Sequence, residues 1–189
     1  MTLTAAPGAK TILPMGYRTD REAWIFSGVV ALIVAAFCVA LKLVFAEQEE
    51  RRQRVLEAHR KELDCLARNI YYEARGEPLA GQYAVAEVTM NRVASPRYPR
   101  RLCEVVYQKR WDPQRKRLVS AFSWTEFDAL PEPAGPEWQR ARRIAEAVYY
   151  GAEPPRLHGA LYFHAVYIKP DWSKEKVRVA RIGRHVFYK

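Results

Sequence analysis

The fold is built around the stretch LARNIYYEARGEP, residues 66–78. Together with Leu63, its apolar side chains follow the i, i+3, i+4, i+7 spacing of a helix with one buried face; they are Leu63, Leu66, Ala67 and Ile70. Gly76 is predicted to end this helix, as a glycine just past a helix C-terminus commonly does. Pro78 is predicted to open the next helix, where its fixed φ and missing N–H do no harm.

Further helices follow on the C-terminal side, and the end of the chain changes character. Apolar residues at helical spacing predict a helix that stops before Ser95, a short helix over 102–107 and a third long helix from Pro136 to a stop at Gly151. The basic segment 109–118 is predicted to be a surface loop. Residues 161–164 and 177–188 are rich in β-branched and aromatic residues, with a hairpin turn at Gly183-Arg184. The expected class is α+β, mainly helical with a small C-terminal antiparallel sheet.

The N-terminal side predicts a membrane helix. Residues 23–45 form an apolar run whose only charge is Lys42, long enough to cross a bilayer core. Residues 1–22 contain several Pro and Gly and are predicted to be a disordered tail, and the charge-rich residues 46–62 a helical stalk. The remaining domain is residues 63–189. A cleaved signal peptide is the alternative for the apolar run, and basic residues on both sides leave its orientation undecided.

Glu73 is the candidate for catalysis. It lies three residues after Ile70 and seven after Leu66, on the helix face that is predicted to be buried. Burial raises the pKa of a carboxyl group, and a neutral acid near pH 7 is what cleavage of a glycosidic bond requires. The alternative is a structural role in which Glu73 pairs with Arg75, with Arg92 or with a helix N-terminus.

Other site types have weaker support. The four histidines lack a metal-ligand spacing, so no metal is expected, and no dinucleotide or phosphate-loop motif points to a cofactor. The net charge of +10 favours anionic partners. The basic stretch 97–117 is either a solvated surface or a site for an anionic polymer. No nucleic-acid motif accompanies it, so nucleic acid is not the expected partner.

The two cysteines of the predicted domain, Cys65 and Cys103, fit either a disulfide in an oxidising compartment or two separate buried thiols. Cys38, inside the apolar run, is interpreted as a small apolar residue.

Several ordered segments between residues 63 and 189 resemble the SleB-type cell wall hydrolases, the spore cortex-lytic enzyme family. The resemblance rests on the segments 66–78, 81–93, 102–108, 121–124, 162–164, 170–172 and 182–188. It implies a lysozyme-like, mainly helical catalytic domain that acts on the glycan strands of peptidoglycan, with Glu73 as the catalytic residue.

The family is similar to lytic transglycosylases, in which one carboxyl group serves first as acid and then as base. A hydrolytic mechanism would need a second carboxylate, for which Glu77 and Glu87 are the first candidates. Substrate contacts are expected from residues of the matching segments: Ser123, Trp124, Tyr162, His164 and Trp172.

The spore enzymes of the family carry a separate wall-binding domain, and we expect the apolar helix to take over its role of localising the enzyme. Because peptidoglycan lies outside the cytoplasm, we expect a single-pass protein of the cytoplasmic membrane with its domain in the periplasm; a phage-encoded enzyme also fits. The competing interpretations are an inactive module that binds peptidoglycan or an envelope partner, and a membrane-tethered nucleic-acid binder.

Overall fold

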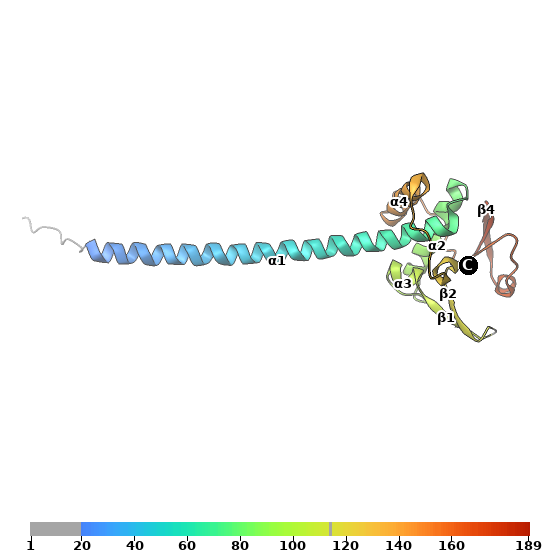
Figure 1. Ribbon diagram of the computed structural model, residues 1–189, viewed down its shortest axis with the longest axis horizontal. Helices are drawn as coiled ribbons and strands as arrows, with labels where there is room; N and C mark the ends of the chain where they lie inside the picture. Colours follow the sequence, from blue (N-terminus) through green and yellow to red (C-terminus); the bar gives the residue numbers. More distant parts are fainter. Residues whose placement is uncertain (1–19, 114) are drawn as a thin grey trace, which may run out of the picture. The chain divides into compact units, whose positions relative to one another are not determined.

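The computed structural model describes residues 20–113 and 115–189 (Figure 1). The chain divides into two compact units, Met1–Gln53 and Arg54–Lys189. Helix α1, Asp20–Ala74, contributes to both units. Of the predicted tail, residues 1–19 lie outside the described residues. Residues 20–22 are helical, which corrects that boundary; Asp20 and Glu22 suit a first turn because the helix N-terminus carries partial positive charge.

The first unit presents an apolar helix surface. Between residues 20 and 53 every residue is exposed, including Trp24 at 77% and Leu32 at 72%. By length and composition, α1 is a helix that can cross a membrane, with a mean hydropathy of 2.8 over its most apolar 18-residue window.

In the second unit, the end of α1 packs with α2, Leu79–Ala94, and α4, Gly135–Tyr149. Their interface contains a cluster of buried apolar residues, among them Leu66, Ile70, Ala86, Ala141 and Ile144. The short helix α3, Leu102–Val106, adds Leu102 to this cluster. The predicted helices are therefore present, and α4 ends before Gly151, which has a φ of +68°.

The predicted end of this helix just before Gly76 is confirmed, although Gly76 does not end it through a left-handed conformation. Helix α1 ends at Ala74, and the Glu77 N–H donates to the Ala74 carbonyl over 2.9 Å to close the turn into α2. Gly76 lies close to the Arg184 guanidinium instead, 3.1 Å from where a Cβ would stand.

The segment predicted as a basic loop is a hairpin. Strands β1, Lys109–Asp112, and β2, Arg117–Ser120, pair antiparallel with Trp111 opposite Leu118. Most of its side chains are exposed, so the sequence lacks the alternation of a half-buried strand. The 3₁₀ helix η1, Ser123–Glu126, follows the hairpin directly.

The C-terminal sheet was predicted correctly. Its order is β3-β5-β4, all antiparallel: β3 spans Tyr162–Ala165, β4 Arg178–Ile182 and β5 His185–Tyr188, and the 3₁₀ helix η2, Asp171–Glu175, precedes β4. All four residues of β5 are buried, and Phe187 packs against Val88 and Leu157. The class is α+β, as expected.

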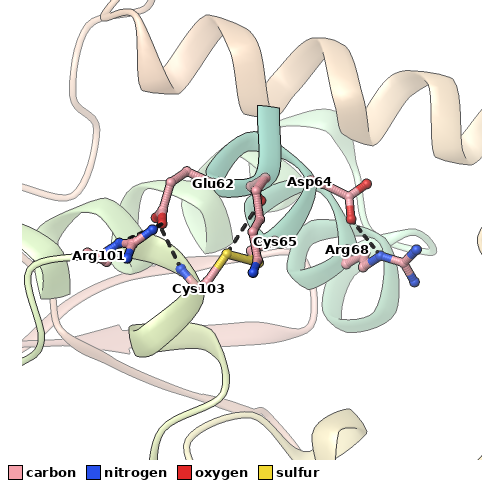
Figure 2. Close-up of a disulfide and its surroundings, with 7 residues drawn as sticks. Glu62, Asp64, Cys65, Arg68, Arg101 and Cys103 are labelled. Atoms are coloured by element: carbon pink, nitrogen blue, oxygen red, sulfur yellow. Dashed lines mark hydrogen bonds and ion pairs between the residues drawn. A yellow bond between two sulfur atoms is a disulfide. The ribbon is translucent and has the colours of Figure 1, made fainter. Parts of the chain in front are cut away.

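A disulfide joins α1 to α3 (Figure 2). It links Cys65 with Cys103, whose Cα atoms are 5.2 Å apart. Beside it, the Glu62 carboxylate accepts hydrogen bonds from the Cys103 N–H, over 3.2 Å, and from Arg101 Nε, over 3.1 Å. The covalent bond and the carboxylate together fix the end of α1 against α3, which holds the α1 turn that carries Glu73.

Candidate active site

Glu73 lies on the last turn of α1 and is half-buried. Its Oε1 atom is buried and has no hydrogen-bond partner within the described residues. The neighbouring turns of the same helix face contain the fully buried Leu66 and Ile70, which explains why this carboxyl group is drawn away from water.

Burial raises the pKa of Glu73 from its ordinary value of 4.5 to about 7, because a carboxylate loses hydration there. Two groups oppose the rise in this pKa by favouring the anion: the positive charge of Arg92 and the backbone N–H of Ser123. Glu73 therefore holds its proton near neutral pH, and the groups that would stabilise its anion are already in place.

Arg92 on α2 is the cation whose charge acts on the Glu73 carboxyl group. Its side chain is buried, its Nε donates to the Leu161 carbonyl over 2.9 Å, and its Cζ lies 4.8 Å from the Phe122 ring centroid. Burial lowers the pKa of Arg92. The Nη1 atom is buried and, within residues 20–113 and 115–189, has no hydrogen-bond partner.

Of the structural partners considered for Glu73, the helix N-terminus is present, because Ser123, whose N–H acts on Glu73, is the first residue of η1. The two arginines are not paired with it: neither Arg75 nor Arg92 forms an ion pair with Glu73 in the part of the chain that the structure describes. The Arg75 guanidinium lies instead over the Tyr71 ring, 4.9 Å from its centroid.

The two other carboxylates considered for a hydrolytic mechanism are already occupied. Glu77, with a side chain 3% exposed, accepts from the Arg184 backbone N–H over 2.8 Å and from Arg184 Nε over 2.6 Å. These bonds outweigh burial and lower the pKa of Glu77. Glu87 accepts from the N–H groups of Arg156 and Leu157, over 2.7 and 2.8 Å. Glu87 ties residues 156 and 157 to α2, and Glu77 ties Arg184 to the turn between α1 and α2.

Of the expected substrate contacts, Ser123 lies at the site, whereas the Trp124 side chain is packed in the core. Ser123 lies beside Glu73, where its backbone N–H acts on the carboxyl group. Trp124 is only 9% exposed: its ring stacks on Tyr72 with centroids 4.6 Å apart, and its Nε1 donates to Asn69 Oδ1 over 2.9 Å. The expectation that Trp124 offers an open face to sugar is therefore wrong, because an indole buries its area in the core when its N–H finds a partner there.

Tyr162, His164 and Trp172 gather on the C-terminal sheet. The Trp172 ring lies 5.6 Å from that of Tyr162 and 5.7 Å from that of His164, and His164 Nε2 is hydrogen-bonded to the Tyr188 hydroxyl over 2.9 Å. All three are half-buried. Tyr162 is linked to the acid through Arg92, whose charge interacts with both Tyr162 and Glu73. In the described part of the chain, no group of three or more His, Cys, Asp or Glu is placed to hold a metal ion.

Sequence reasoning named Arg92 only as a possible structural partner of Glu73 and not as a functional residue of the site. A detectable signal existed: Arg92 lies seven, four and three residues after the buried Val85, Val88 and Thr89, on the buried face of α2. A charge on an apolar face was the reasoning applied to Glu73, and it applies equally here.

Comparison with known proteins agrees with this architecture. The sequence profile described as cell wall hydrolase matches residues 76–188. The chain belongs to the cell wall hydrolase family. The match begins just after Glu73, which therefore lies outside the matched residues. The resemblance that the sequence motifs suggested is confirmed.

Relatives of this family member include two spore cortex-lytic enzymes. That of Halalkalibacterium halodurans is 30% identical over 131 residues, covering 67% of this chain and 34% of the relative. That of Bacillus cereus is 28% identical over 133 residues, covering 68% and 44%. The chain thus spans less than half the length of these relatives. Among solved structures, the catalytic domain of the Bacillus cereus SleB protein matches with a TM-score of 0.52 and 26% identity, over 69% of this chain and 91% of that domain.

Proposed function

We propose that this chain cleaves the glycan strands of peptidoglycan as a lytic transglycosylase, with Glu73 as its one catalytic acid. The observation that carries the proposal is the state of Glu73: a carboxyl group with a buried, unpartnered oxygen and a pKa raised to about 7. Membership of the cell wall hydrolase family supports the substrate class.

In the proposed mechanism, neutral Glu73 gives its proton to the oxygen of the bond that breaks. The positive charge of Arg92 and the Ser123 N–H then stabilise the carboxylate that is left. This carboxylate then takes a proton from the C6 hydroxyl of the sugar whose C1 took part in the broken bond. The C6 oxygen bonds to C1 of that sugar and forms an anhydro ring. One carboxyl group suffices, in keeping with the occupied carboxylates of Glu77 and Glu87.

The membrane location belongs to the same proposal. Residues 23–45 of α1 anchor the chain in the cytoplasmic membrane, with the N-terminus inside and the domain in the periplasm. The exposed apolar surface of this segment supports an anchor, and the Cys65–Cys103 disulfide supports an oxidising compartment for the domain. Alkaline carbonate extraction of cell membranes tests it: the full chain is expected to remain in the pellet and a chain without residues 1–45 to be released.

The activity is tested with the full chain in detergent and purified sacculi. Wild type is expected to release muropeptides, and Glu73→Gln to lower the rate at least about 100-fold, as loss of a general acid does. Glu104→Gln is the matched control, because Glu104 is an exposed carboxylate of the same domain. Equal rates for wild type and Glu73→Gln would reject Glu73 as the acid.

Mass spectrometry of the products decides the mechanism. Anhydro ends are expected for a transglycosylase, whereas reducing ends would contradict it and require a water-activating base. Binding to sacculi without any release would favour the alternative function, a non-catalytic peptidoglycan-binding module.

A further inference from the structure

Four cationic side chains gather around two tyrosine rings on the Arg92 side of Glu73. They come from α2, the segment between α2 and α3, β1, and the segment before β4, and the rings come from the α2–α3 segment and β3. We call this group the cation–tyrosine cluster; its members are Arg92, Arg97, Arg110, Lys176, Tyr98 and Tyr162.

Tyr162 is approached by two of the cations. Arg97 Nη1 donates to the Tyr162 hydroxyl over 3.4 Å, and the Arg97 Cζ lies 6.0 Å from the centroid of the ring. Lys176 Nζ lies 4.8 Å from the same centroid. Both distances are within the range of cation–π attraction.

Tyr98 holds the other two. Arg110 Cζ lies 4.7 Å and Arg92 Cζ 5.5 Å from its ring centroid. The Tyr98 and Tyr162 side chains are hydrogen-bonded to each other, and Arg110 Nη2 donates to the Arg97 carbonyl over 3.1 Å. The two halves of the cluster are therefore one connected group.

The cluster contains four positive charges and no paired carboxylate. Within residues 20–113 and 115–189, none of its cations forms an ion pair. Arg92 is only 7% exposed and its Nη1 atom has no partner there. Arg92 also interacts electrostatically with Glu73, which carries no charge while it is protonated. The four cations repel one another because no negative charge lies among the cluster members. An anion that entered the cluster would be attracted by several of these cations at once.

The four cations differ in their exposure to solvent, and this difference suits the binding of an anion. Arg97 and Arg110 are exposed and Lys176 is half-buried, so these three can touch a ligand directly. Arg92 lies behind them and adds its charge from the interior. The tyrosine rings hold the cations in place without neutralising them, because an aromatic face attracts a cation but carries no net charge.

We propose that the cation–tyrosine cluster binds a carboxylate carried by the substrate next to the bond that Glu73 cleaves. Alternate sugars of peptidoglycan bear a lactyl group that ends in a free carboxylate or continues into a peptide with carboxylates of its own. The proposal rests on the proposed function and narrows its substrate class: acidic, carboxylate-bearing glycan is preferred over neutral glycan.

The test compares native sacculi with sacculi whose carboxylates have been converted to methylamides by carbodiimide coupling. The full chain in detergent is assayed at low salt, and the ratio of release rates, native over amidated, is the readout. We expect a ratio of about ten for wild type, since charge-assisted hydrogen bonds to several cations are lost together. The triple variant R97Q/R110Q/K176Q is expected to have a ratio near one.

Arg156→Gln is the matched control for this variant. Arg156 also lies over a tyrosine, with Cζ 5.0 Å from the Tyr83 ring centroid, but it is outside the cluster and paired with Glu153. It is expected to keep the wild-type ratio. Because each ratio compares two substrates with the same protein, a loss of folded protein in the triple variant cancels.

A ratio that is the same for wild type and triple variant would overturn the proposal while leaving the cleavage itself intact. Failure of the proposed function is recognised separately by a pull-down with Glu73→Gln. If wild type cleaves nothing but Glu73→Gln is retained by native and not by amidated sacculi, the cluster binds carboxylate and the catalytic proposal fails.

Sacculi stripped of peptides by an amidase keep only the lactyl carboxylate. If wild type still cleaves these stripped sacculi faster than their amidated form, the lactyl carboxylate is the ligand. If this rate difference is lost, the ligand is a carboxylate of the peptide. Both results support the site. Two results together would point to nucleic acid and overturn the proposal. Wild type, but not the triple variant, would be retained on double-stranded DNA, and wild type would cleave native and amidated sacculi at equal rates.

Discussion

The unusual state of Glu73 has a consequence for stability that is measured without substrate. Its pKa is 4.5 in an ordinary setting and about 7 in the folded protein. Between these pH values the unfolded chain loses a proton that the folded protein keeps, so the free energy of unfolding falls as the pH rises from about 4.5 to about 7. Below this window the contribution is fully present, and above it the loss is complete. Each pH unit corresponds to about 1.36 kcal/mol, so the whole loss is about 3 kcal/mol.

Glu73→Gln replaces the acid by a neutral side chain of the same shape and removes this pH dependence. Wild type and variant are expected to unfold at nearly the same temperature at pH 4.5. At pH 8 the variant is expected to be more stable, with a melting temperature higher by roughly 10 °C, since about 1 kcal/mol shifts a domain of this size by a few degrees. A substitution that abolishes the proposed catalysis would thus stabilise the fold.

The assay is thermal unfolding of the full chain in detergent, followed by near-ultraviolet circular dichroism between pH 4.5 and 8.5. This signal reports aromatic side chains in fixed surroundings, such as the stacked rings of Tyr72 and Trp124 in the second unit. Glu104→Gln, which changes an exposed carboxyl group, is expected to show no pH-dependent difference from wild type. A constant difference between Glu73→Gln and wild type across this pH range would refute the reasoning, because the Glu73 pKa would then be unshifted.

Three further outcomes are expected. The kcat/KM of glycan cleavage falls about tenfold per pH unit above about 7, because only protonated Glu73 donates; a rate that is flat up to pH 9 would contradict this. Reduction of the Cys65–Cys103 disulfide lowers the free energy of unfolding by about 4 kcal/mol, the chain-entropy value for its sequence separation of 38; dithiothreitol leaving the melting temperature unchanged would speak against it. Glu77→Gln costs about 1–3 kcal/mol, because hydrogen bonds to Arg184 are weakened at a buried position; chemical denaturation measures it, and a neutral result would deny Glu77 a structural role.

The elements that sequence reasoning found are those whose signal is local. The i, i+3, i+4, i+7 spacing around Ile70 requires only neighbouring residues, and so does the Gly183-Arg184 turn between two apolar strands. The β1–β2 hairpin was missed because both of its faces are largely exposed, so burial imposes no alternation on Lys109–Asp112.

The buried placement of Glu73 could be predicted from the sequence, whereas the contacts around it could not. Glu73 shares a helix face with Leu66 and Ile70, and that placement is visible in the sequence. The roles of the other acids depend on partners far along the chain: Glu77 meets a turn 107 positions away, and Glu87 meets N–H groups 69 and 70 positions away. No local pattern contains such contacts. Trp124 was misjudged for the same reason, since its partner Asn69 lies 55 positions earlier.

The acids of this domain differ in the hydrogen-bond donors around them, and this difference supports the proposed role of Glu73. The residues Glu62, Glu77 and Glu87 expose less of their surface than Glu73, yet backbone N–H groups are turned toward each of them, and each links two segments of the chain. A carboxylate that accepts several N–H bonds keeps its charge at little cost, whereas one with an unpartnered buried oxygen is more stable neutral. The distinction therefore lies in whether enough donors surround the side chain to offset its burial, and not in the residue type. Glu73 receives one such N–H, from Ser123, and the field of Arg92, which is enough to stabilise its anion when a proton leaves and too little to remove the proton beforehand. That balance is what a group requires if it is to act first as an acid and then as a base.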